Sequence, residues 1–312
     1  MFNNAIQTFK ASISPPKTRI ESLSPLILVF GGAASDINNK YASCRSVFLD
    51  WAFSSSYDLS KYLIKPEDYK EWNQFEGYDN LVDFERDAGC LSRGILLFSE
   101  CEGALAELGA FCMDDVLCER LLVVVAKDHY DAPSFIKLGP IRRIEEAHSS
   151  SAICVVDSTS DPKLFEPEVV GVGEALKAKV VTLPKTHRFN SNSTRDQFLL
   201  IADLVELFGA LTKKEIEELL LFMGIEHEAK RLKRMLNLLQ LLDLIVESGH
   251  LTERYFVPPK ERIRFFDYSA PEEAKSKFER SRFKLTTALP ALSKEAVRSK
   301  AYAKIHGEIK WV

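Results

Sequence analysis

The sequence predicts an α/β domain with a doubly wound, largely parallel sheet, followed by a winged-helix domain and a helical basic tail. Two patterns lead to this expectation. In the first half, short apolar runs of strand length alternate with mixed stretches of helix length. In the second half, three helix-length stretches precede two strand-like runs. A length of 312 residues is enough for two domains, each with its own core.

Continuous apolar runs of this length are typical of parallel strands that are buried on both faces. They predict strands at residues 26–30, 62–64, 94–98, 121–126 and 152–156. The helix-length stretches between them predict helices near residues 39–53, 80–90 and 105–120.

A polar segment at residues 187–196, rich in Asn and Ser, marks the domain boundary. Helices are then expected at 196–208, at 212–223 with a capping box of Thr212 and Glu215, and near 226–241. A hairpin around Ser248 and Gly249 completes the order of a winged helix. We therefore expect four parts, namely an N-terminal arm (1–24), an α/β domain (25–188), a winged helix (189–259) and a basic tail (260–312).

The charge of the chain is distributed unevenly. Residues 260–312 hold 13 Lys and Arg against 7 Asp and Glu, whereas residues 1–259 hold 28 against 38. A basic end on an acidic body suggests a polyanionic partner held locally. A solvated helical tail would give the same pattern, so both interpretations stay open.

Several classes of protein are not expected. The six cysteines form no CxxC pair and follow no secretory signal, which predicts reduced thiols in the cytoplasm. The histidines show no metal-ligand spacing, so no metal site is expected. No apolar run approaches the roughly 20 residues that cross a bilayer. The sequence does not decide between a monomer and a homo-oligomer.

Ligands of such sheets bind beyond the carboxyl ends of the strands, which directs attention to two loops. After residue 98, a polar loop leads to a helix that should begin near Ala104 and carry Glu107 in its first turns. The positive end of a helix would keep the Glu107 carboxylate ionised. Gly103 would leave room for a ligand there.

The loop after residue 30 begins with Gly31 and Gly32, which would let backbone amides approach a phosphate or sugar, and Asp36 follows. The GxGxxG spacing of dinucleotide-binding redox folds is absent. A carboxylate beside such a cleft can stabilise the anomeric carbon as an N-glycosidic bond opens. Glu85 is the candidate second carboxylate that orients the ribose, with Asp83 and Asp87 nearby.

The run EGALAELGA at residues 102–110 resembles the G-x-x-x-E-L/I-G-x-A signature of nucleoside deoxyribosyltransferases. The whole chain is similar to retron-associated effectors that join such a domain to a winged helix. This similarity also covers FGG at 30–32, KPED at 65–68 and SFIKLGPIR at 134–142. It implies that Glu107 is the catalytic carboxylate and that Gly31, Gly32 and Gly103 border the nucleotide.

The resemblance further implies a toxin that cleaves the N-glycosidic bond of NAD or a related purine nucleotide, which would be substrate and not cofactor. Its partners would be the retron reverse transcriptase and RNA-linked single-stranded DNA (msDNA), which keep it inactive. The transferases usually place an Asp six residues before the Glu, where this chain has Cys101, and the acidic residue after the glycines is displaced to Asp36. These departures favour hydrolysis over base exchange.

Two other functions stay open. One is a nucleotide-sensing transcription regulator without catalytic activity, in which Glu107 only caps its helix or pairs with a cation. The other is an N-glycosidase that acts on bases within DNA. In each case the third helix of the winged helix would contact nucleic acid, unless its cations only face solvent. Those cations are Lys230, Arg231, Lys233 and Arg234.

Overall fold

The computed structural model describes residues 2–34, 39, 41–68, 78–182, 186–250, 253–274 and 276–308, the side chain of His250 excepted. The chain forms two compact units. The first, which we call the α/β unit, comprises Ser24–Asn73 and Asn80–Leu183. The second, which we call the helical unit, comprises Met1–Leu23, Gln74–Asp79 and Pro184–Val312. Within the described ranges, no helix has both the length and the apolar character needed to cross a membrane.

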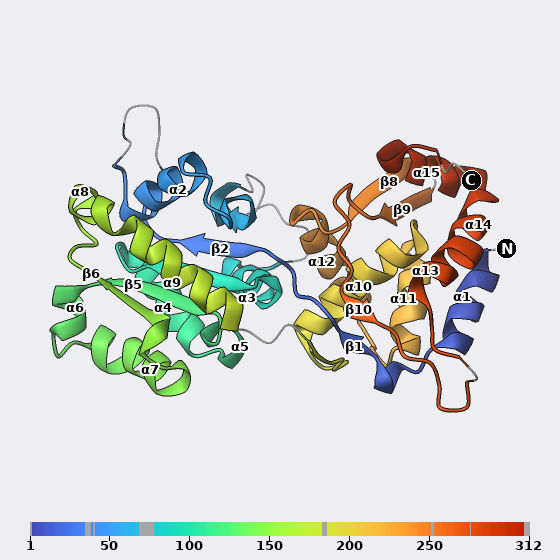
Figure 1. Ribbon diagram of the computed structural model, residues 1–312, viewed down its shortest axis with the longest axis horizontal. Helices are drawn as coiled ribbons and strands as arrows, with labels where there is room; N and C mark the ends of the chain where they lie inside the picture. Colours follow the sequence, from blue (N-terminus) through green and yellow to red (C-terminus); the bar gives the residue numbers. More distant parts are fainter. Residues whose placement is uncertain are drawn as a thin grey trace. The chain divides into compact units, whose positions relative to one another are not determined.

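A five-stranded parallel sheet forms the centre of the α/β unit (Figure 1). Its strands follow the order β3-β2-β4-β5-β6. Every residue of β2, β4 and β5 is buried, as expected for a parallel sheet that helices cover on both faces. The predicted α/β class and parallel sheet are confirmed, and each strand bound lies within one residue of its prediction. The strands are β2 (Ile27–Phe30), β3 (Leu63–Ile64), β4 (Gly94–Phe98), β5 (Leu121–Ala126) and β6 (Ile153–Val156).

Helices α2 (Cys44–Ser54) and α9 (Val169–Thr182) pack on one face of this sheet. A Cβ atom at Gly173 of α9 would come within 2.6 Å of the Trp51 ring of α2. Glycine at this position therefore allows the two helices to approach closely. Helix α2 opens with a capping box in which Ser43 and Ser46 satisfy each other's backbone amides.

The other face is covered by α3 (Leu81–Leu91), α4 (Glu102–Cys112) and α5 (Asp115–Cys118). Phe111 of α4 meets Phe30 of β2 edge-on, with ring centroids 5.0 Å apart. The prediction of a single helix at 105–120 was wrong. The Asp114 side chain accepts hydrogen bonds from two backbone amides and so begins a separate helix, α5. Further α-helices of the unit are α6 (Lys127–Asp131), α7 (Arg142–His148) and α8 (Pro162–Phe165).

In the helical unit, three helices precede an antiparallel hairpin, in the order that the sequence predicts. The capping box of Thr212 and Glu215 is present at the start of the second helix. The helices are α10 (Thr194–Phe208), α11 (Lys213–Phe222) and α12 (Ala229–Leu241), and the hairpin strands are β8 (Val246–His250) and β9 (Glu253–Val257).

The two ends of the chain are part of this same unit and are not a separate arm and tail. Helix α1 (Phe2–Ser12) buries Phe9, whose ring contacts those of Phe208 and Phe283. A small sheet of β1 (Arg19–Ile20), β7 (His187–Arg188) and β10 (Phe266–Asp267) joins both ends of the chain. The C-terminal helices are α13 (Arg280–Phe283), α14 (Leu289–Ser293) and α15 (Ala296–His306).

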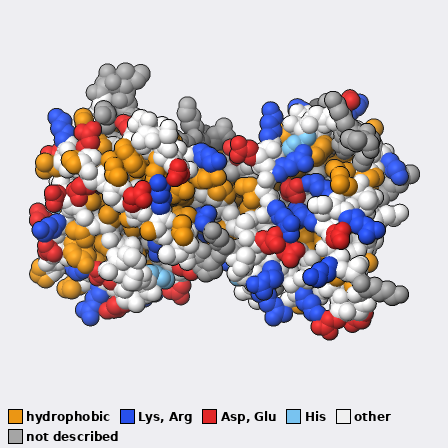
Figure 2. Space-filling model, in the orientation of Figure 1, with side chains coloured by type: hydrophobic (Ala, Val, Ile, Leu, Met, Phe, Trp, Pro, Cys, Tyr) orange, Lys and Arg blue, Asp and Glu red, His pale blue; other side chains and the backbone are white. Residues whose placement is uncertain are grey.

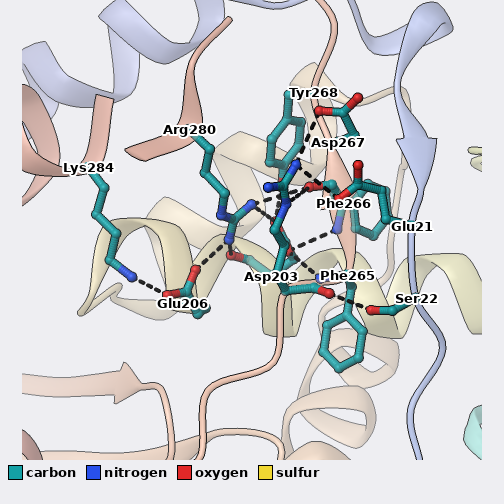
Figure 3. Close-up of polar contacts among 11 residues, drawn as sticks. Glu21, Ser22, Asp203, Glu206, Phe265, Phe266, Asp267, Tyr268, Arg280 and Lys284 are labelled. Atoms are coloured by element: carbon teal, nitrogen blue, oxygen red, sulfur yellow. Dashed lines mark hydrogen bonds and ion pairs between the residues drawn. The ribbon is translucent and has the colours of Figure 1, made fainter. Parts of the chain in front are cut away.

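Buried carboxylates on α10 hold the segment that follows the hairpin (Figure 3). Asp203, which is 0% exposed, accepts hydrogen bonds from two backbone amides of β10 and its flank, from the Tyr268 hydroxyl at 2.7 Å and from Arg280 at 2.8 Å. Glu206 on the next turn pairs with both Arg280 and Lys284. Two cations of the basic segment are therefore neutralised inside the unit.

Arg298 of α15 is a third cation used internally. It is buried, pairs with Glu215 at 2.6 Å and with Glu295 at 2.9 Å, and lies 3.5 Å from the centroid of the Phe2 ring. On the face shown in Figure 2, the basic side chains of the helical unit lie among acidic ones. The expectation of a basic tail, whether solvated or holding a polyanion, is thus wrong for Arg280, Lys284 and Arg298, because tertiary ion pairs take up their charge.

We expect Asp203→Ala to lower the free energy of unfolding of the helical unit by about 3–5 kcal/mol, because two buried amides and the Tyr268 hydroxyl lose their acceptor and Arg280 loses one of its two carboxylate partners. Asp267→Ala, which removes an exposed carboxylate paired with Arg264, should cost less than about 1 kcal/mol. Urea denaturation measures both. Equal midpoints for the two variants would show that the buried cluster does not hold the C-terminal segment.

Candidate active site at the carboxyl edge of the sheet

Glu107 lies deeper in its helix than expected. Helix α4 begins at Glu102, with Cys101 at the N-cap, so Glu107 is six residues inside and beyond the free amides of the first turn. The prediction that the positive end of the helix keeps it ionised is therefore wrong. Burial, followed by the negative charge of Glu67, raises the pKa of Glu107 to about 7, and Arg45 opposes this rise.

Glu85 of α3 forms part of the same group of carboxylates. It is buried, and burial, followed by the charges of Glu107 and Glu67, raises its pKa to about 8. The structure thus places Glu85, Glu107 and Glu67 within electrostatic reach of one another. Asp83 stands at the start of α3 instead, where its amide and carboxylate bond to the Asn80 side chain.

Arg45 and Glu67 are members of this group to which the sequence analysis assigned no role. Arg45 of α2 is 2% exposed, and its Nη1 lies 2.9 and 3.0 Å from the two oxygens of Glu67, in the 3₁₀ helix η3 (Pro66–Asp68). A cation in the first turn of a helix opposes the helix dipole. That unfavourable position is the signal that could have pointed to a tertiary partner for Arg45.

The carboxylate of Glu100, a residue that follows β4, lies against the loop after β2, where we expected a phosphate or sugar. This carboxylate accepts hydrogen bonds from the amides of Gly32 at 2.7 Å, Cys44 at 2.6 Å and Arg45 at 3.1 Å. A Cβ atom at Gly31 would lie 2.7 Å from Glu100 Oε1. In this structure the two glycines make room for the chain's own anion, which corrects the expectation that the Gly32 amide is open to a ligand.

The remaining candidates near this edge differ in their surroundings. A Cβ atom at Gly103 would meet nothing within 4 Å, so the space that we expected there is open. Cys101 caps α4 without a side-chain hydrogen bond. Asp36 lies outside the described residues. The nucleotide-binding roles of Gly31, Gly32, Asp36 and Gly103 stay predictions.

Two polar atoms of the group are buried and have no hydrogen-bond partner within the described structure. They are Oε2 of Glu107 and Nε of Arg45, one an acceptor and the other a donor. Buried polar atoms are nearly always paired, so such atoms are candidates for a ligand or an ordered water. A pocket of about 750 Å³ elsewhere on the α/β unit, lined by residues that include Trp51, Phe53 and Glu166, does not include this group.

The four cations predicted to meet nucleic acid all lie on α12, and their surroundings differ. Lys230 pairs with Asp79 at 3.0 Å, and Arg231 lies 5.7 Å from the centroid of the Phe198 ring. Arg234 lies over the ring of Tyr78. Lys233 is exposed. Contact with nucleic acid stays a prediction for all four.

Comparison with known proteins relates the chain to retron effectors. The family model of the STM3845 retron effector protein matches residues 41–247, about two thirds of the chain. The protein named "Retron Ec73 putative ribosyltransferase/DNA-binding protein" of Escherichia coli is 27% identical over 182 residues. That match covers 54% of this chain and 57% of the relative, so the chain spans little more than half of the relative's length. On the match to its model, the chain belongs to the STM3845 retron effector family.

Proposed function

We propose that this chain is the toxin-like effector of a retron anti-phage system and that its α/β unit hydrolyses the N-glycosidic bond of NAD or a related purine nucleotide. The observation that carries the proposal is a pair of carboxyl groups at the carboxyl edge of the parallel sheet, the buried Glu85 and the half-buried Glu107, with pKa values raised to about 8 and about 7. The name of the Escherichia coli relative, which includes ribosyltransferase, supports chemistry at a ribose.

The pair suits opening of an N-glycosidic bond because its members differ in protonation. Near neutral pH the favoured singly protonated form has Glu107 ionised and Glu85 protonated. The Glu107 carboxylate would face the anomeric carbon and stabilise the positive charge that develops there as the base departs. The Glu85 carboxyl would hydrogen-bond to a ribose hydroxyl. A water oxygen then adds to the anomeric carbon, and its proton passes to Glu107. Nicotinamide leaves NAD as a neutral molecule, whereas a departing purine anion takes this proton from Glu107 and becomes the neutral base.

Arg45 and Glu100 would position this pair and not react themselves. Glu100 fixes the start of α2 through the amides of Cys44 and Arg45, and Arg45 in turn holds Glu67. The charge of Arg45 keeps the pKa of Glu107 from rising further. Without that cation, Glu107 would be protonated over more of the neutral range and could not support the cation-like transition state.

We expect the helical unit to bind the retron partners that keep the effector inactive. Helices α10, α11 and α12 followed by the β8–β9 hairpin have the element order of a winged helix. The relative's name also includes DNA-binding protein. We infer that α12 contacts the RNA-linked single-stranded DNA of the retron, bound together with its reverse transcriptase in the cytoplasm, and that this assembly keeps the enzyme inactive.

A second candidate is an N-glycosidase that acts on bases within DNA. One observation favours it, which is that the name of the relative joins ribosyltransferase and DNA-binding protein in one chain. In that case the α/β unit would take its base from nucleic acid and not from a free nucleotide.

We expect Glu107→Gln to reduce base release by at least about 100-fold, because the variant loses the only carboxylate placed to stabilise the anomeric carbon in this proposal. Glu102→Gln, on the exposed start of the same helix, is the matched control and should retain activity. The assay is chromatography of the base released from NAD, purine nucleotides and single-stranded DNA supplied in parallel. Release from DNA alone would select the second candidate. If no substrate loses its base, the chain is a sensor without catalytic activity.

The two pKa values also predict a narrow pH optimum. Activity should rise with pH through about 7, as Glu107 loses its proton, and fall above about 8, as Glu85 loses its own. Glu85→Gln should remove the alkaline limb while keeping the acid limb, since glutamine does not ionise. The rate constant kcat/KM measured between pH 5 and 9.5 tests this. A rate that stays level from pH 5 to 7 would refute the assignment of Glu107.

A further inference from the structure

A carboxylate from a distant part of the sequence lies on the cationic face of α12. Asp79 accepts hydrogen bonds from Nζ of Lys230 at 3.0 and 3.2 Å, and Nη2 of Arg234 lies 3.9 Å from it. All three residues belong to the helical unit. Lys230 lowers the pKa of Asp79, so the carboxylate is ionised in neutral solution.

Tyr78, the residue before Asp79, also contacts α12. The Tyr78 ring lies against the Arg234 guanidinium, with 4.7 Å from the guanidinium carbon to the ring centroid. Arg234 is only 17% exposed. A guanidinium stacks equally well on the base of an unpaired nucleotide, and a Lys or Arg pairs with phosphate as it does with carboxylate. Tyr78 and Asp79 thus present to α12 the two kinds of group, a flat ring and an anion, that one unpaired nucleotide presents.

The contact is of a kind that a stronger competitor displaces. The side chains of Lys230 and Asp79 are 61% and 69% exposed, and ion pairs this exposed contribute little to stability. A nucleic-acid strand, by contrast, offers a row of phosphates and gains from the release of condensed counterions when cations bind it. The free energy of binding therefore favours a nucleic-acid strand over the Asp79 carboxylate as the partner of these cations.

We propose that Tyr78 and Asp79 act as an internal substitute for one nucleotide, and that single-stranded nucleic acid binds α12 by taking their place on Arg234 and Lys230. The phosphate replaces Asp79 on Lys230, and an unpaired base replaces the Tyr78 ring on Arg234. This inference rests on the proposed nucleic-acid role of α12. A single strand fits better than a duplex, because the bases of a duplex are already stacked on one another.

We expect Asp79→Asn to tighten binding of a fluorescein-labelled 20-nucleotide single-stranded DNA about two- to fivefold at 50 mM salt, since the strand no longer has to break an ion pair. Fluorescence anisotropy with the full chain measures it. Glu228→Gln is the matched control. Glu228 lies at the exposed start of α12 and makes no side-chain capping hydrogen bond, so this variant removes the same charge and should change the affinity less. Combining Asp79→Asn with Lys230→Gln should abolish the gain. Unchanged thermal melting confirms that the variants fold.

Tyr78→Leu should tighten binding of the single strand but not of a 20-base-pair duplex. An equal gain for both would overturn the single-strand assignment, and equal gains for Asp79→Asn and Glu228→Gln would overturn the substitute role of Asp79. Replacing Lys230, Arg231, Lys233 and Arg234 together by Gln distinguishes failure of the proposed nucleic-acid role of α12 from failure of the substitute role of Tyr78 and Asp79. If that variant binds DNA as tightly as the unaltered chain does, the proposed nucleic-acid role of α12 itself fails. If it binds weakly while Asp79→Asn shows no gain, only the present inference fails.

Discussion

The carboxylate of Glu100 is the constraint on which the arrangement of the α/β unit depends. It accepts hydrogen bonds from three backbone amides, one in the loop after β2 and two at the start of α2. Glu100 itself lies in the loop after β4. A carboxylate at a helix start satisfies amides that the helix leaves free and lies at its positive end. This one side chain therefore ties the carboxyl ends of two neighbouring strands to α2. The buried Arg45 side chain, and with it Glu67, is placed as a consequence.

The proton chemistry of the site follows from this placement and from burial. Arg45 pairs with Glu67 and lowers the pKa of Glu107, but the charges of Glu107 and Glu67 raise the pKa of Glu85, so these three carboxyl groups cannot all be ionised at low cost. The protons remain where burial and neighbouring charge are greatest, on Glu85 and then on Glu107. In the proposed reaction, such a site would let the ionised Glu107 stabilise the charge on the ribose while the protonated Glu85 donates a hydrogen bond.

Local patterns in the sequence predicted the strands and the three helices with their hairpin, because apolar periodicity depends on neighbouring residues. A short motif also singled out Glu107, whose catalytic role stays a prediction. Local patterns could not predict the partners of Arg45 or of Glu100, which lie 22 residues or more away in the chain. Net charge misled for residues 260–312, since Arg280, Lys284 and Arg298 bind carboxylates of α10 and α11. The two glycines after β2 were found, but their neighbour turned out to be Glu100.

The proposed function requires Glu85 to keep its proton at a pH at which Glu107 is ionised. Carbon-detected NMR titration of the side-chain carboxyl groups in the full chain measures both protonation states, with assignments from Glu85→Gln and Glu107→Gln. We expect two carboxyl resonances that titrate near pH 8 and pH 7, well above that of the exposed Glu102. Titration of both groups near pH 4.5, as in open solvent, would contradict it.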